Sequence, residues 1–195
     1  LADSFCAEAL EGVDRFMAQA RTSQASGSSE TDRATVVVAG VAKLSSGLNA
    51  FAASDYSSVQ VQQFVHLMPL SAYDEALQPV PNLAESWEVG EDGTTITFHL
   101  RSDVFWHDGE PTDAHDVAFT YIRMTDPRTA FQNAGYWTFY ESGSEGVEVL
   151  DDFTVRMHMQ PHEDFMDPWR TVGIMPEHLL GDVAPEELGA HPFGS

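Results

Sequence analysis

The chain has 195 residues, with 31 Asp or Glu against nine Lys or Arg, and its formal net charge is −22 at pH 7. A surface this acidic repels the phosphate backbone of nucleic acids and anionic lipid headgroups, and Lys43, the only lysine, leaves no polybasic segment for either partner. Hydrophobic residues make up 43% of the chain, enough for a core, but no apolar run approaches the roughly 20 residues of a membrane-spanning helix.

The first 33 residues differ in character from the rest of the chain. Apolar residues at helical spacing predict a helix over residues 7–20. A polar, serine-rich run over residues 22–29 is typical of a flexible linker. We therefore expect residues 1–33 to form a peripheral helix and linker, and the globular part to begin near Ala34.

The single cysteine, Cys6, excludes an internal disulfide and a thiol-rich metal site. Phe5 precedes it, whereas a lipidation site has small residues there, so a lipid anchor at Cys6 is the weaker alternative. The printed chain starts without a secretory signal peptide, and export would require that the signal has been removed.

Three elements are predicted in the first half of the globular part. The β-branched run over residues 35–41 suits a strand buried on both faces, and the mixed pattern of residues 57–67 favours a helix. Residues 84–89 and 94–101 flank the turn Asp92-Gly93, which indicates a hairpin. In its second strand one face is apolar: Ile96, Phe98 and Leu100.

A helix follows, with Thr112 as its expected N-cap. Asp113 and Asp116 fall in its first turn, where negative charge is favourable, and the helix should stop before Pro127. The apolar stripe of this helix consists of Ala114, Val117, Ala118, Tyr121 and Ile122.

A second hairpin is predicted from residues 147–150 and 153–159, joined by Asp151-Asp152. Helical turns are expected at residues 165–169 and 176–180. Strands and helices mix without strict alternation, so the fold class is mixed α/β.

No phosphate-binding loop, dinucleotide fingerprint or nucleophile elbow is present. His158 and His162 are four residues apart, but Pro161 excludes the helix that would place them on one face, and His158 belongs to the outward face of a strand. We therefore expect no metal site and no cofactor. Among 31 acidic residues, a carboxylate pair suited to acid–base catalysis carries little information.

Four aromatic residues lie within five positions beside Gly135. They could line a ligand site or form a strand that packs in the core, and the sequence leaves both interpretations open. The four are Tyr136, Trp137, Phe139 and Tyr140.

The stretch from Pro79 to Met124, PVPNLAESWEVGEDGTTITFHLRSDVFWHDGEPTDAHDVAFTYIRM, resembles the signature region of the family-5 solute-binding proteins of ABC importers. The order of its features carries the resemblance: LAESW, the Asp92-Gly93 hairpin, TFHLR and WHDGEP before a helix. Its residues Trp87, Phe98, Leu100 and Trp106 have the character of core residues. The resemblance extends over about residues 34–195, through VEVLDDFTVRM, MPEHL and HPFGS.

The resemblance implies the N-terminal part of a two-lobed periplasmic-binding-protein fold, with lobe two absent. Residues 34–70 would be the first strand and helix of lobe one. Residues 71–190 would form a mixed α/β subdomain, and residues 191–195 would begin the return to lobe one.

The resemblance also implies a function and a site. The protein would be a non-enzymatic carrier, periplasmic or extracytoplasmic, that captures a peptide or another small solute and delivers it to an ABC permease in the membrane. The alternatives are a nickel, haem, opine or oligosaccharide carrier of the same family, a secreted hydrolase with an Asp/Glu pair, and an inactive fragment. By comparison with oligopeptide-binding relatives the ligand-binding residues would be Ser54, Asp55, Tyr56, Asn133, Tyr136 and Trp137.

Overall fold

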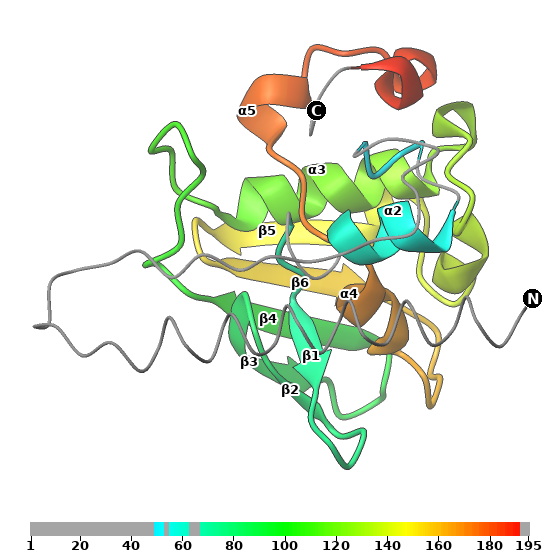
Figure 1. Cartoon of the computed structure of the whole chain (residues 1–195). Helices are drawn as coiled ribbons and strands as arrows, with labels where there is room; N and C mark the ends of the chain where they lie inside the picture. Colours follow the sequence, from blue (N-terminus) through cyan, green and yellow to red (C-terminus); the bar gives the residue numbers. More distant parts are fainter. Residues whose placement is uncertain (1–48, 53–54, 63–66, 192–195) are drawn as a thin grey trace, which may run out of the picture. The chain divides into compact units, whose positions relative to one another are not determined.

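The computed structural model describes residues 49–52, 55–62 and 67–191, which form a mixed α/β unit, as predicted (Figure 1). The predictions for the peripheral helix, the linker, the strand at residues 35–41 and the end of the chain lie outside the described residues. None of the described helices is long and apolar enough to cross a membrane.

The largest element is a four-stranded antiparallel sheet in the order β3-β4-β6-β5. Its strands are β3 Ala84–Val89, β4 Thr95–Leu100, β5 Val147–Asp151 and β6 Thr154–His158. Both predicted hairpins are therefore confirmed, and β4 pairs with β6 to join them. The apolar residues of the two central strands are buried, as their alternation predicts; they are Ile96, Phe98, Leu100, Val155 and Met157.

The turn of the first hairpin depends on its Asp-Gly pair. Gly93 has a φ of +69°, a left-handed conformation that other residues adopt only with strain. The Asp92 carboxylate accepts hydrogen bonds from the Thr94 backbone N–H at 3.0 Å and from its hydroxyl at 2.8 Å. These bonds lower the pKa of Asp92, so the turn is most stable when this carboxyl is ionised.

A second, two-stranded sheet was not predicted. It pairs β1 Ser71–Tyr73 with β2 Pro79–Pro81, and three residues per strand are too few to show a period. β1 contacts the helix α4 Asp167–Thr171, where the Tyr73 hydroxyl donates to the Asp167 carboxylate at 2.9 Å. The guanidinium of Arg170 lies 4.5 Å from the Tyr73 ring centroid.

The predicted helices exist, with shifted limits. The predicted helix at 57–67 is α2 Tyr56–Val61 in the structure, and its expected last residue, Leu67, is irregular. The predicted turn at 165–169 begins two residues later, at Asp167, where Pro168 can occupy the first turn of a helix. The last α-helix is α5 Glu177–Leu180. Short 3-10 helices lie at η2 Pro127–Thr129, η3 Ala134–Trp137, η4 Gly143–Gly146 and η5 Pro185–Ala190.

The long helix α3, Ala114–Thr125, ends before Pro127 as predicted, but its N-cap is Asp113 and not Thr112. The Asp113 carboxylate accepts from the backbone N–H groups of His115, at 2.8 Å, and Asp116, at 3.2 Å. Thr112, the residue before this cap, pairs with another segment: its backbone N–H donates to the carbonyl of Val104. An Asp is as good a cap as a Thr, so the backbone pairing decides the position.

Both faces of α3 are covered. Its apolar stripe packs on β5 and β6, and the segment that leads into α5 lies along its other side (Figure 1). That second side carries polar groups one helical turn apart, at positions 116, 120 and 123. Thr120 Oγ1 accepts from the Met175 N–H at 2.8 Å, and Arg123 donates to the Gly181 carbonyl at 3.0 Å.

The third polar group of this side, Asp116, is only 4% exposed. Its carboxylate accepts hydrogen bonds from Trp106 Nε1 at 2.8 Å, the Glu177 N–H at 2.7 Å and the Asp113 N–H at 3.2 Å. Burial raises the pKa of the Asp116 carboxyl, against the opposing effect of these three donors. The carboxylate thereby joins α3 to the loop of Trp106 and to the start of α5.

The tryptophans of the signature motif are less buried than expected. Phe98 and Leu100 are core residues, as predicted, but Trp87 and Trp106 are half-buried and pack against the edge of the core. Trp106 is only half-buried because its indole N–H donates to the Asp116 carboxylate, and this bond holds the ring at the edge of the core.

Aromatic rings fill the other end of the core. Tyr121, Trp137, Tyr140 and Trp169 are all at most 5% exposed, and the Trp137 and Trp169 ring centroids are 4.6 Å apart. Trp169 Nε1 donates to the Tyr140 hydroxyl at 2.9 Å, and that hydroxyl donates to the Phe165 carbonyl at 2.7 Å. Burial raises the pKa of the Tyr121 and Tyr140 hydroxyls, so both remain protonated.

The first prediction concerns the buried carboxylate. Asp116→Asn keeps the shape of the side chain but leaves one oxygen to serve three donors, so at least one buried N–H loses its acceptor. We expect the free energy of unfolding, measured by urea denaturation, to fall by about 1–3 kcal/mol. The control is Asp113→Asn, which keeps a capping oxygen and should change stability by a few tenths of a kcal/mol. Equal stability of Asp116→Asn and the wild type would contradict the assignment.

The second prediction follows from the net charge of −22. Carboxylates crowded on a folded surface repel one another, and salt screens them: the Debye length falls from about 10 Å at 0.1 M to about 3 Å at 1 M. We expect Tm to rise as NaCl is increased over this range, by more than in a neutral osmolyte of equal osmolality. A Tm that is unchanged or lower in salt would show that repulsion does not limit stability.

Candidate functional site

The segment that leads into α2 is fixed by Asn49. Its amide Nδ2 donates to the carbonyls of Leu188, at 2.8 Å, and His191, at 2.7 Å, while its Oδ1 accepts from the Phe51 N–H. One buried side chain therefore holds the start of this segment against the last 3-10 helix, although about 140 residues separate them in sequence.

Two of the predicted ligand-binding residues lie at the start of α2. Asp55 is the N-cap: its carboxylate accepts from the Ser58 N–H at 3.0 Å and from the Ser58 hydroxyl at 2.6 Å. Tyr56 is 77% exposed, and its hydroxyl accepts from Gln60 Nε2 at 2.7 Å. Ser54, the third member of this segment, lies outside the described residues.

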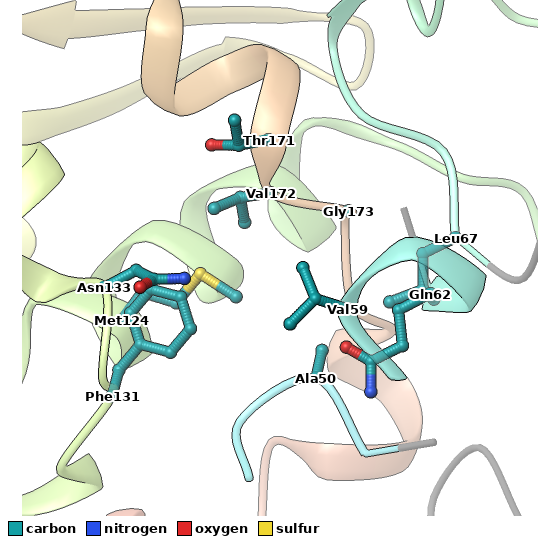
Figure 2. A pocket seen from close by; sticks show the side chains of 10 residues that line it. All are labelled: Ala50, Val59, Gln62, Leu67, Met124, Phe131, Asn133, Thr171, Val172 and Gly173. Carbon is teal, nitrogen blue, oxygen red and sulfur yellow. The ribbon is translucent and has the colours of Figure 1, made fainter. Parts of the chain in front are cut away.

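A small cavity of about 30 Å³ lies where α2, the loop after η2 and the end of α4 meet (Figure 2). α2 contributes Val59 and its C-cap Gln62, and the loop contributes the predicted Asn133. Of the six predicted ligand-binding residues, only Asn133 is among the lining residues; Asp55 and Tyr56 lie at the opposite end of α2 from Gln62. The described residues that line it are Ala50, Val59, Gln62, Leu67, Met124, Phe131, Asn133, Thr171, Val172 and Gly173.

The polar side chains among the described residues of the lining are few and uncharged. They are the carboxamides of Gln62 and Asn133 and the hydroxyl of Thr171, which is itself bonded to the Asp167 and Pro168 carbonyls. Gln62 is 5% exposed, and its Nε2 has no hydrogen-bond acceptor among the described residues. Most buried donors in proteins have a partner, so this one calls for an explanation, as do Ser71 Oγ and Trp137 Nε1 elsewhere in the described residues.

The other two predicted residues lie apart from the cavity lining. Tyr136 is 52% exposed, whereas Trp137 is 3% exposed and belongs to the aromatic core. Residues 134–137 form the 3-10 helix η3, so the strand that was one of the two interpretations of this segment is wrong. Its aromatic residues are adjacent instead of alternating, and alternation is what a strand with one buried face requires.

Sequence reasoning missed most of the lining, Gln62 included. No signal set Gln62 apart, because Gln60, Gln63 and His66 lie in the same run from Val59 to Leu67. The apolar members Leu67, Met124 and Val172 carried no signal, because an apolar residue in a wall and one in the core have the same pattern.

His158 and His162 do not share a helix, in agreement with the break expected at Pro161. His158 ends β6, and His162 lies beyond the break at Pro161, with its ring stacked on Phe139 at a centroid distance of 4.2 Å. Within the described ranges, no three His, Cys, Asp or Glu side chains come together in a way that could hold a metal ion.

Comparisons with known proteins agree with the fold. The family model described as bacterial extracellular solute-binding proteins, family 5, middle region, matches residues 78–195. The periplasmic oligopeptide-binding protein OppA of Haemophilus influenzae is 40% identical over 91 residues, which cover 40% of this chain and 17% of the relative.

Two solved structures match as well. The crystal structure of H. influenzae OppA in complex with RPPGFSPFR has a TM-score of 0.64 and 26% identity, over 73% of this chain and 31% of the other. That of NikZ from Campylobacter jejuni in complex with Ni(L-His) has a TM-score of 0.61 and 27% identity, over 81% and 29%. The chain thus spans less than a third of the length of each of these three relatives. Since the family model matches more than half of its residues, the chain belongs to family 5 of the bacterial extracellular solute-binding proteins.

Proposed function

We propose that the protein is the substrate-binding component of an ABC importer, which captures peptides outside the cytoplasm and delivers them to a membrane permease. The family membership carries this proposal, and the relatives named as oligopeptide-binding support peptides as the solute. Asn133, which lines the cavity, and the helix α2 that Asp55 caps would form one wall of the site, and Tyr56 and Tyr136 are exposed side chains of the same two segments. Trp137 would act from the core behind them. Ser54 is included on the family resemblance alone.

We also propose that the protein is not an enzyme. A general acid needs a raised pKa and access to its substrate. Asp116 is the only carboxyl in the described part of the chain whose pKa is raised, yet it is buried and its oxygens are occupied by three protein donors. A hydrolase based on an Asp/Glu pair therefore finds no support among these residues, and a bound peptide should be recovered intact.

The third prediction tests the solute. The full-length protein is titrated by calorimetry with the nonapeptide RPPGFSPFR and, separately, with Ni(II) plus L-histidine, the groups bound by the two structural relatives. We expect saturable binding of the peptide, micromolar or tighter, and no saturable binding of the nickel chelate. The reverse result would make the protein a metal-chelate carrier of the same family, and peptide binding would be excluded.

The fourth prediction tests the placement of the site between two lobes. A closing cleft removes both faces of a ligand from water, whereas one wall covers about half of it. We expect residues 1–195 alone to bind the nonapeptide at least about 100-fold more weakly than the full-length protein, a difference of about 3 kcal/mol. Equal affinities would show that the whole site lies within these 195 residues.

A further inference from the structure

The unpaired carboxamide of Gln62 bears on what the cavity recognises, and the argument rests on the proposed function. Gln62 is the C-cap of α2 and is only 5% exposed. Its Nε2 donates to no acceptor among the described residues. Burying an amide without a hydrogen-bond partner is unfavourable, and a bound partner removes that cost.

The lining restricts the chemistry of that partner. Among the described residues that line the cavity there is no Asp, Glu, His, Arg or Lys, so these residues offer neither a counter-ion for a carboxylate or an ammonium group nor a ligand set for a metal. Its walls are mostly apolar, with Val59, Met124 and Phe131 among them, and would leave the many hydroxyls of a saccharide unpaired.

A carboxamide has one acceptor oxygen and two donor hydrogens in one plane. A peptide unit presents the complementary set, one C=O and one N–H, and is uncharged. Figure 2 shows Gln62 and Leu67 on one side of the cavity, with Asn133, Met124 and Phe131 on the other. A volume of about 30 Å³ is about the share of one water molecule in the liquid, so the cavity admits one small polar group, such as the C=O or the N–H of a peptide unit.

We infer that Gln62 is a solute-binding residue whose carboxamide pairs with a main-chain peptide unit of the bound solute, and that Asn133 lies at the mouth of the same subsite. The fit is independent of the solute's side chains. The residue would therefore contribute affinity for peptides as a class and would not discriminate among their sequences.

The test uses Gln62→Met in the full-length protein, because methionine is unbranched, similar in length and apolar. If the Gln62 donor is unpaired in the free protein and paired in the complex, the substitution should affect the stability of the free protein and its affinity for peptide differently. The urea midpoint of the free protein should be equal to or higher than that of the wild type. The affinity for RPPGFSPFR should fall about 5- to 100-fold.

Ser71→Ala is the matched control. Ser71 is 1% exposed, its Oγ also lacks a partner among the described residues, and it does not line the cavity. Its removal should leave peptide affinity unchanged. The same 5- to 100-fold loss should appear in Gln62→Met with a second, unrelated peptide such as trialanine.

Three results would overturn the inference, and they can be told apart. Equal affinity of Gln62→Met and the wild type would remove Gln62 from the site and leave the proposed function intact. A clear loss of stability in the free variant would show that the carboxamide has a structural partner in the protein. Failure of the wild type to bind either peptide would overturn both the inference and the peptide function on which it rests.

Discussion

A single buried carboxylate organises the packing around α3. Asp116 receives hydrogen bonds from the Trp106 indole, from the N-cap of its own helix and from the first residue of α5, and no positive charge accompanies them. A carboxylate is removed from water at a considerable cost unless its lone pairs are occupied, so the three donors have to be held in place together. The loop of Trp106 and the segment before α5 are thus fixed relative to α3.

The hydrogen bonds of α3 also fix the chain next to the candidate site. Thr120, one turn after Asp116, binds the Met175 N–H, and the Ile174 N–H donates to the Met68 carbonyl at 3.1 Å. The residues directly before them, Thr171 to Gly173, form a wall of the cavity. A Cβ built on Gly173 would lie 2.3 Å from Leu67 Cβ, so this wall approaches Leu67, on the facing wall, as closely as the absence of a side chain allows. The polar side of α3 therefore sets the distance between the walls.

The sequence predicted the elements that have a period and missed what depends on distant contacts. The alternation of Ile96, Phe98 and Leu100 and the apolar stripe of α3 each follow from one continuous segment. The β1–β2 sheet is too short for a period, and the N-cap shifted to Asp113 because Thr112 pairs with Val104. The cavity could not be predicted, because its residues come from three separate parts of the chain, and the pairing state of Gln62 depends on all of them.

Native-state hydrogen exchange tests the central claim, that α3 positions the Met175–Glu177 segment through buried hydrogen bonds. These two amides lie outside any strand and precede or begin a four-residue helix, so without Thr120 and Asp116 they would exchange about as fast as loop amides. The account predicts that both exchange only with the free energy of global unfolding, as the amides of β4 and β6 do. Exchange of both amides at the rate of an exposed loop would contradict it.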